Sequence, residues 1–574
     1  MARLGDLHVW LQAHETVADR VVRWRKDDMA FTKSTTGKAL ALTAVALLAV
    51  SLGACGTKKK STGSGGTSGG TSASKPMTLG TTDQVVALDP AASYDFGSLM
   101  LEINLYQFLM QVPAGKKTPE PDAAESCSFT QPTEYTCKLK AGQKFSNGDP
   151  LTADDVVFSY KRVAKIQDPN GPSSLIANMT DVKAPDPTTV VFTLKNANDQ
   201  TWPLVLGTSA GPIVDSKVFA ADKILADDKI IGSGPYALAS YNKNQLVALK
   251  ANPNYSGPNK AKASSVTLKY YTQPTNMKLD IQQGAIDVAL RSLTPTDLAS
   301  LKSASGVKVL TGAGGELRYM VFNYKTMPGK NDAQKLAIRQ AMAYSVDRQA
   351  IADKVFKGSY QPAYSMVPNG IADATEPFKD VFGSAPDKAK AAAALQAAGV
   401  TTPVTLNLQY TLGHYGPVSD QEYNELKRQF EATGLFKVSI QSTEYTTYTK
   451  ERVKDTYPIY QLGWFPDFVD ADNYLFNFLN EQNFVHAHYC DAGAKNRPCD
   501  KDGVLPLLTT EETKPGAERT AALTQIQKVL ATGQMPYLPL LSGNQVAVVR
   551  SNVSGVQETL DPTYLIRFWL FSKS

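Results

Sequence analysis

Residues 232–236 read Gly-Ser-Gly-Pro-Tyr, a stretch that decides how the chain enters a strand. Glycine reaches backbone angles that are closed to other residues, and proline holds its own φ near one value. The stretch therefore predicts a tight connection that leads into a strand just after Pro235. Its role is structural, and we do not expect it to contact a ligand.

Working outward from this connection, short β-rich runs alternate with helical stretches. Residues 189–195 (TVVFTLK) and 265–271 (SVTLKYY) predict strands. Residues 332–356 predict a pair of core-facing helices, with Asp347 capping the second helix, and residues 420–433 predict a further helix. The fold class is therefore α/β with mixed sheets.

Composition limits the possible functions. The chain has 574 residues, of which 43% are hydrophobic, enough for several domains packed into one body. Its 59 Lys and Arg oppose 54 Asp and Glu, which leaves a formal net charge of +5 and no strong basic field. Nucleic acid is therefore not an expected partner. With five His and five Cys, neither a metal site nor a cofactor is expected.

An uncharged apolar run, ALALTAVALLAVSL, occupies residues 39–52 and is followed by Gly-Ala-Cys, which ends at Cys55. The run is shorter than the roughly 20 residues of a membrane-spanning helix but fits the ~7 to 15 of a signal-peptide core. Small residues directly before a cysteine resemble the cleavage site of bacterial lipoprotein signals. We therefore expect residues 1–54 to be absent from the mature protein and the thiol of Cys55 to carry a lipid. Residues 1–28 form an unusually long lead, so we expect translation to start at Met29. The alternative, a plain secretion signal, does not explain Cys55.

Residues 55–75 are rich in glycine, serine and threonine and contain no apolar residue able to pack. They predict a flexible tether with a reach of about 25 Å. The globular part would then begin at Pro76, and the lipid would anchor it on the extracytoplasmic face of the cell membrane.

Four cysteines remain, and they form two pairs that are close in sequence, Cys127 with Cys137 and Cys490 with Cys499. Exported chains form disulfides readily. The first pair brackets a Pro-containing turn between strand-like ends, which suits a bridged hairpin. Each short loop predicts a stabilisation of about 2 to 3 kcal/mol.

The segment with His486, His488 and Cys490 also suits a cluster of metal ligands. We favour the disulfide, because Cys490 has a partner and no further cluster follows at ligand spacing. After residue 54, only His414 joins these two histidines, which disfavours nickel as a ligand.

Gly207, Ser209 and Gly211 match a G-x-S-x-G pattern, which in hydrolases exposes a nucleophilic serine on a strand-to-helix turn. Pro212 follows at once, and the next residues, IVDSKVF, do not open a helix. A secreted serine hydrolase is therefore a minor alternative, and we expect no enzyme activity. The sequence contains no P-loop, so ATP hydrolysis would fall to partner subunits.

A series of short motifs runs in a specific order from about residue 78 to the C-terminus. In chain order they are ALDP (87–90), LY (105–106), FSNGDP (145–150), LTADDV (151–156), GSGPY (232–236), NPNY (252–255), GAIDV (284–288), FN (322–323), IRQA (338–341), YSVDR (344–348) and GWFPD (463–467). The series resembles the family 5 extracellular solute-binding proteins, which include oligopeptide-, dipeptide- and nickel-binding components of ABC importers.

The resemblance implies a two-lobed clamshell, like the periplasmic binding proteins, with an extra subdomain inserted in the first lobe. By analogy, lobe I combines residues 76–98, 230–317 and 539–574, while residues 99–229 form the inserted subdomain and residues 318–538 form lobe II. The chain would cross twice near a hinge, and the ligand would stabilise the closed state by touching both lobes.

The resemblance also implies ligand-binding residues in the last motif. Asp467 matches the acidic residue that peptide-binding relatives use against the ligand α-amine, and Gly463 and Trp464 precede it. Trp464 could line a side-chain pocket or belong to the core, and both alternatives stay open. Ala471 stands where many relatives have proline, so the geometry of the loop after Asp467 also stays open.

The implied function is capture of a small solute, in the first place a di- or oligopeptide, for the permease and ATPase subunits of an ABC importer. Relatives with the same scaffold also accept oligosaccharides, metal chelates or haem, so these remain alternatives. A receptor that signals ligand presence without import is a further alternative. We expect the protein to be a monomer.

Overall fold

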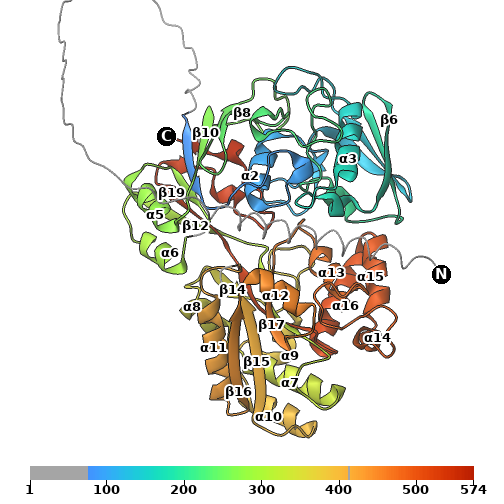
Figure 1. The fold of residues 1–574 in the computed structure, drawn as a ribbon, viewed down its shortest axis with the longest axis vertical. Helices are drawn as coiled ribbons and strands as arrows, with labels where there is room; N and C mark the ends of the chain where they lie inside the picture. The colour runs from blue at the N-terminus through green and yellow to red at the C-terminus, as the bar shows by residue number, and fades with distance from the viewer. Residues whose placement is uncertain (1–74, 292, 412–413) are drawn as a thin grey trace, which may run out of the picture. The chain divides into compact units, whose positions relative to one another are not determined.

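The computed structural model describes residues 75–291, 293–411 and 414–574 (Figure 1). The expected signal peptide and the lipidated Cys55 lie outside the described residues, as does the tether except for its last residue. Within the described ranges, no helix is long and apolar enough to cross a membrane. The larger sheets have seven, six and four strands, and helices pack against them, so the α/β class with mixed sheets is confirmed.

The seven-stranded sheet has the strand order β12-β19-β11-β1-β10-β9-β8. Its central strand β1 pairs in parallel with β10 and β11, and the remaining neighbours are antiparallel. The strands are β1 (Met77–Thr81), β8 (Tyr236–Asn242), β9 (Leu246–Ala251), β10 (Ser265–Tyr270), β11 (Val288–Leu290), β12 (Val307–Gly312) and β19 (Gln545–Arg550). Helices α2 (Phe96–Leu105), α5 (Pro274–Gln283) and α6 (Pro295–Leu301) accompany this sheet.

Strand β8 begins at Tyr236, directly after Pro235, as the opening stretch predicts. The reason for the glycines differs from the expectation, because neither has a positive φ. A Cβ on Gly232 would lie 2.0 Å from the carbonyl oxygen of Leu105, and one on Gly234 would lie 2.6 Å from the carbonyl carbon of that residue. The glycines therefore allow the connection to run against the end of α2.

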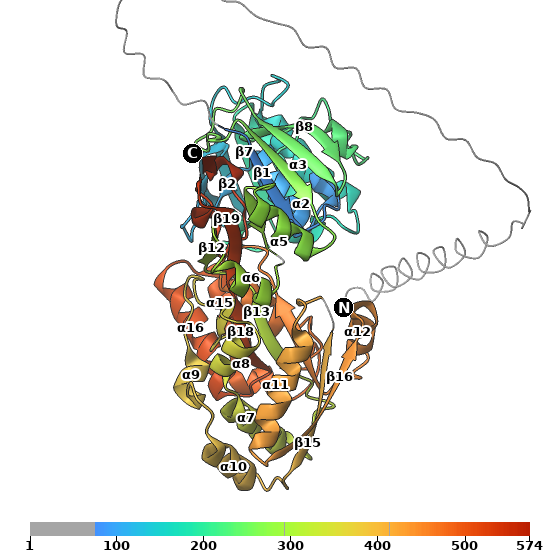
Figure 2. The same ribbon diagram turned by 90° about the vertical axis from the view of Figure 1, so that its left-hand side faces the viewer.

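The six-stranded sheet has the order β14-β18-β13-β17-β15-β16. Its strands are β13 (Leu317–Phe322), β14 (Tyr360–Pro362), β15 (Val404–Thr411), β16 (Phe436–Thr443), β17 (Ile459–Trp464) and β18 (Tyr537–Gly543). Strand β13 is buried along its whole length, and Figure 2 shows α11 (Ser419–Ala432) lying along β15 and β16. The other helices of this part of the chain are α7 (Asp332–Ser345), α8 (Arg348–Lys354), α9 (Pro377–Phe382), α10 (Lys388–Ala397), α12 (Tyr445–Arg452), α13 (Phe476–Leu479), α14 (Pro498–Asp502), α15 (Val504–Thr513) and α16 (Ala517–Thr532).

The four-stranded sheet is antiparallel, with the order β4-β5-β7-β6, and has its own apolar core together with α3 (Ala153–Ile166). Its strands are β4 (Ala124–Gln131), β5 (Glu134–Leu139), β6 (Met179–Asp186) and β7 (Thr189–Leu194). The short elements include α4 (Trp202–Val205) and the strand pairs β2 (Met110–Gln111) with β3 (Glu120–Pro121) and β20 (Val553–Ser554) with β21 (Ser572–Lys573). The 3-10 helices of the described chain are η1 (Pro90–Ala92), η2 (Ser173–Ile176), η3 (Asp227–Lys229), η4 (Asp472–Tyr474), η5 (Gln557–Thr559) and η6 (Phe568–Leu570).

Both expected disulfides are present in the structure. Cys127 of β4 lies directly opposite Cys137 of β5 and is bonded to it. Cys490 is bonded to Cys499 at the start of α14. The first bridge ties two neighbouring strands together, and the second closes a loop.

The chain passes between the two large sheets twice. Gly312, at the end of β12, lies opposite Gln545, the first residue of β19. On the other side of the passage, Leu317 of β13 lies opposite Ser542 of β18. The two connecting segments, residues 313–316 and Asn544, therefore run side by side.

Three of the expected lobe boundaries fall inside secondary-structure elements. The boundary between residues 317 and 318 falls within β13, since Leu317 is already paired in the six-stranded sheet. Residue 99 lies within α2, whose Met100 and Leu101 pack in the core beneath the seven-stranded sheet. Residue 539 lies within β18, which pairs with β13 and β14 of the six-stranded sheet. Strand pairing places the second passage at Asn544 instead, because hydrogen bonds hold the whole of β18 in one sheet.

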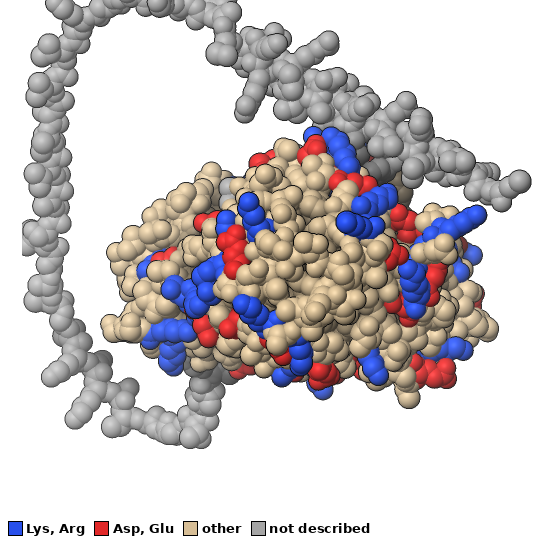
Figure 3. All heavy atoms as spheres, turned by 90° about the horizontal axis from the view of Figure 1, so that it is seen from below, with Lys and Arg blue, Asp and Glu red and all other residues tan. Residues whose placement is uncertain are grey.

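The local expectations are confirmed closely. The two predicted strands form β7 and β10, and the predicted helix at residues 420–433 forms α11, shifted by one residue. The predicted helix pair forms α7 and α8, and the carboxylate of Asp347 accepts the backbone N–H of Ala350 at 2.9 Å as the cap of α8. On the face shown in Figure 3, basic and acidic side chains are interspersed, in keeping with the near-neutral composition.

Candidate functional site

A cavity of about 510 Å³ is lined by residues from both large sheets and their connections. This volume lies within the roughly 300 to 1,000 Å³ of typical small-ligand pockets. The lining residues of the seven-stranded part are Asp83, Pro274, Ala289, Arg291, Leu293, Thr294, Pro295, Leu298, Gln545, Val546, Ala547, Val548 and Tyr564. The remaining ones are Glu316, Phe356, Ser359, Tyr360, His414, Tyr415, Gly416, Pro417, Val418, Phe465 and Asn544.

The cavity contains charged groups of both signs. Arg291 follows β11, and its Nε lies 3.5 Å from Oδ2 of Asp83. Glu316, in the connection between β12 and β13, accepts a hydrogen bond from the hydroxyl of Tyr360 at 2.6 Å and lies 3.7 Å from Nη1 of Arg318. Burial raises the pKa of Glu316, and the guanidinium of Arg318 offsets part of that rise. The site thus offers a cation and two acidic groups to a ligand.

Aromatic side chains form another wall of the cavity. The ring of Phe465, just after β17, lies 5.2 Å from the ring of Phe96 in α2 and 5.7 Å from that of Tyr564, both between centroids. The hydroxyl of Tyr564 lies 3.0 Å from the backbone nitrogen of Glu316, which donates to it. These contacts join segments that are far apart in the sequence. Aromatic side chains present a large apolar surface to a ligand and lose little rotamer freedom when they are fixed.

The structure places Asp467 beside this cavity rather than among its lining residues. Phe465 and Tyr564 line the large cavity, whereas Pro466 and Asp467 line a neighbouring hollow of about 30 Å³. The carboxylate of Asp467 accepts hydrogen bonds from the hydroxyl of Tyr94 and, at 3.3 Å, from Nδ2 of Asn473. Burial raises the pKa of Asp467, and these two hydrogen bonds offset part of the rise.

Trp464 packs away from the large cavity. Its ring lies 5.0 Å from that of Phe478 in a T-shaped arrangement, and its Nε1 donates to Oδ1 of Asn473 at 3.0 Å. Of the two open alternatives, this geometry corresponds to packing at the core. The same Asn473 oxygen accepts the backbone N–H of Asp467 at 2.9 Å, so Trp464 and Asp467 share one partner.

Gly463 lies next to Trp464 in β17 and shapes the cavity indirectly. A Cβ at this position would lie 2.6 Å from the ring of Tyr415. The absence of a side chain lets Tyr415 pack against the strand, and Tyr415 is one of the residues that line the cavity. The three expected residues therefore lie close together, at or behind the wall of the site.

Sequence reasoning missed Arg291, Glu316 and Tyr564. None of them belongs to a motif that we singled out, although Arg291 follows the motif GAIDV by three residues. An arginine directly after a short apolar run is a weak sequence signal that could have identified Arg291. Glu316 and Tyr564 have no local signal, because only tertiary packing brings them to the cavity.

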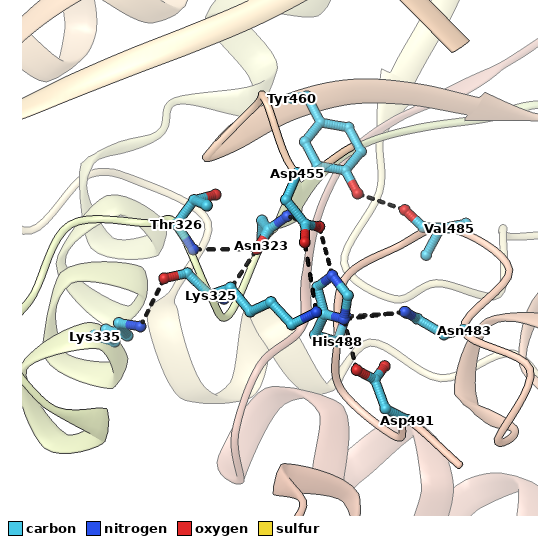
Figure 4. Close-up of polar contacts among 10 residues, drawn as sticks. All are labelled: Asn323, Lys325, Thr326, Lys335, Asp455, Tyr460, Asn483, Val485, His488 and Asp491. Atoms are coloured by element: carbon cyan, nitrogen blue, oxygen red, sulfur yellow. Dashed lines mark hydrogen bonds and ion pairs between the residues drawn. The ribbon is translucent and has the colours of Figure 1, made fainter. Parts of the chain in front are cut away.

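Among the described residues, the segment with His486, His488 and Cys490 does not form a group that could hold a metal ion. Cys490 is in its disulfide, and His488 lies between two carboxylates (Figure 4). Its Nδ1 lies 2.6 Å from Oδ2 of Asp491, and its Nε2 lies 2.5 Å from Oδ1 of Asp455. Both ring nitrogens of His488 are therefore engaged by carboxylates.

Ser209 of the G-x-S-x-G pattern is buried in a turn after α4. Burial raises the pKa of the nearby carboxyl group of Glu102, and Ser209 is one of the groups that offset part of this rise. A nucleophilic serine needs a base such as histidine within hydrogen-bond reach and an exposed hydroxyl. The local geometry therefore does not match the nucleophile turn of a hydrolase.

Two large sheets with a cavity lined by residues from both are typical of a binding protein whose ligand lies between two lobes. The family model described as "Bacterial extracellular solute-binding proteins, family 5 Middle" matches residues 118–485, and the chain belongs to this family. Proteins of this family serve transport as binding components rather than as enzymes.

The names of two curated relatives give different ligands. The di/tripeptide-binding protein 1 of Pseudomonas aeruginosa (strain UCBPP-PA14) is 26% identical over 481 residues, which cover 78% of this chain and 85% of that protein. The heme-binding protein A of Haemophilus influenzae is 25% identical over 479 residues, which cover 79% of this chain and 84% of that protein.

Solved structures share the fold. HbpA2 from Haemophilus parasuis aligns with a TM-score of 0.75 at 21% identity, covering 87% of this chain and all of that one. The dipeptide-binding protein from Pseudoalteromonas sp. SM9913, in complex with Met-Leu, aligns with a TM-score of 0.69 at 19% identity and the same coverage. These similarities confirm the fold of the periplasmic binding proteins.

Proposed function

We propose that this protein captures short peptides, di- or oligopeptides, outside the cytoplasm and delivers them to an ABC importer. One observation carries the proposal: a cavity of about 510 Å³ between the two large sheets holds Arg291 together with Asp83 and Glu316. A peptide has a positive α-amine, a negative carboxylate and apolar side chains. A cavity with charges of both signs and aromatic walls matches these three features.

The proposed mechanism uses the two passages between the sheets as a hinge. Residues 313–316 and Asn544 are short, adjacent connections between bodies that each have their own core. We take the seven-stranded sheet as lobe I, the four-stranded sheet as its inserted subdomain and the six-stranded sheet as lobe II. A peptide that touches both lobes would stabilise the closed arrangement.

Asp467 is the proposed partner of the ligand α-amine. Its carboxylate is already a hydrogen-bond acceptor for Tyr94, so it can accept hydrogen bonds from an ammonium group in the same place. Asn473 would hold the carboxylate in position by its amide nitrogen. Gly463 and Trp464 would support the site by shaping the strand that carries it.

We further propose that the lipid on Cys55 anchors the protein on the extracytoplasmic face of the membrane. The tether would allow the monomer to reach the permease, while the ATPase subunits would supply the energy for transport. Radiolabelled palmitate fed to cells should label the wild-type protein and leave Cys55→Ser unlabelled. Labelling of both proteins would contradict this anchor.

Identifying the natural ligand tests the peptide proposal directly. The protein would be purified from cells without refolding and then denatured, and the released small molecules would be identified by mass spectrometry. Peptides of narrow length would support the proposal. An oligosaccharide, a metal chelate or haem would contradict the peptide as ligand and leave the importer role in place.

A further inference from the structure

Arg291 lies in the cavity in a conformation that few residues adopt. It follows β11 directly and has a φ of 54°, in the left-handed region that disfavours side chains with a Cβ. Non-glycine residues held in this region are concentrated at binding sites, where the surrounding structure imposes the conformation. Arg291 is also one of the residues that line the cavity.

Three aromatic rings surround the guanidinium group of Arg291. Its Cζ lies 4.7 Å from the ring centroid of Phe96 and 5.7 Å from the centroids of both Phe465 and Tyr564. Rings at these distances attract a flat cation and hold it in place. The head of the side chain is therefore ordered before any ligand arrives.

The guanidinium group of Arg291 has N–H donors that no described residue accepts. Among the described residues, its single ion-pair contact is Nε to Asp83 at 3.5 Å, and no hydrogen bond satisfies its terminal nitrogens. The neighbouring Arg318 differs, since it donates to Glu422, to the hydroxyl of Ser419 and to the carbonyl of Tyr415. An arginine carries five N–H donors, and the side chain of Arg291 is 25% exposed, so its terminal nitrogens are open to an acceptor in the cavity.

We propose that Arg291 is the residue that recognises the free carboxylate of the ligand, with its two terminal nitrogens donating in parallel to the two carboxylate oxygens. The inference rests on the proposed peptide-binding function. Asp83 would keep its contact with Nε, so the ligand adds to the existing pair without displacing it. The flat fork of arginine matches a carboxylate in this bidentate geometry, which a lysine could not reproduce.

The proposal predicts selectivity for acids over amides. The probe is a synthetic pool of di- to pentapeptides built from Gly, Ala, Leu and Phe, prepared once with free C-terminal carboxylates and once as C-terminal amides. Binding of each pool to the purified full chain is measured by native mass spectrometry. The wild-type protein should prefer the acids by about 10- to 100-fold, the range expected for a charge-assisted hydrogen bond.

Substitution then assigns the selectivity to Arg291. Arg291→Gln should reduce the preference for acids to within about threefold, and Arg291→Lys should retain only part of it. Lys308→Gln removes one exposed positive charge from the same sheet and should keep the wild-type preference. Unchanged acid preference in Arg291→Gln, or equal binding of both pools by the wild type, would overturn the inference.

Two further results separate the possible failures. If the wild-type protein binds neither pool, the peptide function itself fails, and the inference about Arg291 fails with it. If Arg291→Gln does not fold, phenylglyoxal labelling of the wild-type protein replaces it. Acids should protect Arg291 from labelling and amides should not, and equal labelling with both would overturn the inference.

Discussion

The phenolic hydroxyl of Tyr94 donates a hydrogen bond to the carboxylate of Asp467, a residue 373 positions further along the chain. Tyr94 precedes α2, beside the seven-stranded sheet, and Asp467 follows β17 of the six-stranded sheet. Desolvation of the hydroxyl and the neighbouring Asp467 raise the pKa of Tyr94, so the phenol stays protonated and remains a donor. This polar contact thus links the two parts of the protein at the carboxylate proposed for the ligand amine.

Asp467→Ala should weaken the binding of peptides with a free α-amine by about 100-fold or more, because loss of one partner of a buried ion pair typically costs about 3 to 5 kcal/mol. Isothermal titration calorimetry with the peptide pool measures the effect. Tyr94→Phe is the matched control. It removes the donor that now occupies the carboxylate and should keep the affinity within a few fold.

Equal affinities for Asp467→Ala and the wild type, with both proteins folded by circular dichroism, would remove Asp467 from the binding site. A large loss in Tyr94→Phe instead would indicate that the contact between the two residues, rather than the carboxylate alone, supports binding.

Gly463→Ala should lower both stability and ligand affinity. The new Cβ would lie 2.6 Å from the ring of Tyr415, and overpacking of this kind costs about 1 to 3 kcal/mol. Displacement of Tyr415 would also reshape the cavity that it lines. Chemical denaturation and calorimetry measure the two effects.

The Tyr415→Ala background tests the cause of that loss. Without the ring, Gly463→Ala should cost much less, so the two substitutions should be strongly non-additive. Additive costs would show that the added methyl group acts on something other than Tyr415.

Asp122→Asn should alter how stability depends on pH. Burial raises the pKa of Asp122 from 3.8 to about 6, even though its carboxylate accepts the backbone N–H of Phe108 at 3.0 Å. The folded protein therefore retains this proton at pH values where the unfolded chain has lost it. The stability contribution of the protonated group is fully present below pH 3.8 and is lost as pH rises through about 6.

The loss from this one group should be about 2 to 3 kcal/mol between pH 4 and pH 7, and Asp122→Asn should lack it. Urea denaturation at several pH values gives the free energy of unfolding of both proteins. Parallel pH profiles for the two proteins would show that Asp122 does not titrate as described.

His488→Gln should destabilise the six-stranded part of the protein by about 1 to 3 kcal/mol, since it leaves two partly buried carboxylates without their common donor. The imidazole bridges Asp455 and Asp491, as Figure 4 shows. Burial alone would raise the pKa of Asp455, but hydrogen bonds from His488 and Asn323 hold that pKa below its ordinary value. The stability from this contact is therefore present above the unfolded pKa of an aspartate and is lost as pH falls through the folded one.

The free-energy difference between the wild type and Asp455→Asn should accordingly be larger at pH 6 than near pH 3, which urea denaturation can measure. A difference that does not change over this range would show that Asp455 makes no favourable charge contact with His488.

Part of the candidate site could be predicted from the sequence, and part could not. The last motif led to Gly463, Trp464 and Asp467, and the structure places these three residues close together, at or behind the wall of the cavity. Their roles as ligand contacts stay proposals. Arg291 was missed because its importance depends on rings from three other segments, none of which is near it in the sequence.

The sequence by itself determined the features that depend on neighbouring residues. These include strands β7 and β10, the cap that Asp347 provides for α8, the pairing of four cysteines and the ordered motifs of the family. Side-chain alternation, capping and short loops act over a few residues, so a linear pattern contains the information.

Only the tertiary structure decided where the cavity lies and why Gly232 and Gly234 are glycines. The cavity collects residues from position 83 to position 564, and the two glycines avoid the backbone of Leu105. The paths of β12 to β13 and of β18 to β19 between the two sheets likewise follow from hydrogen bonds between distant strands. Such contacts join segments that are far apart along the chain, and no local sequence pattern indicates which distant segments will meet. Long-range pairing is decided only when the cores pack.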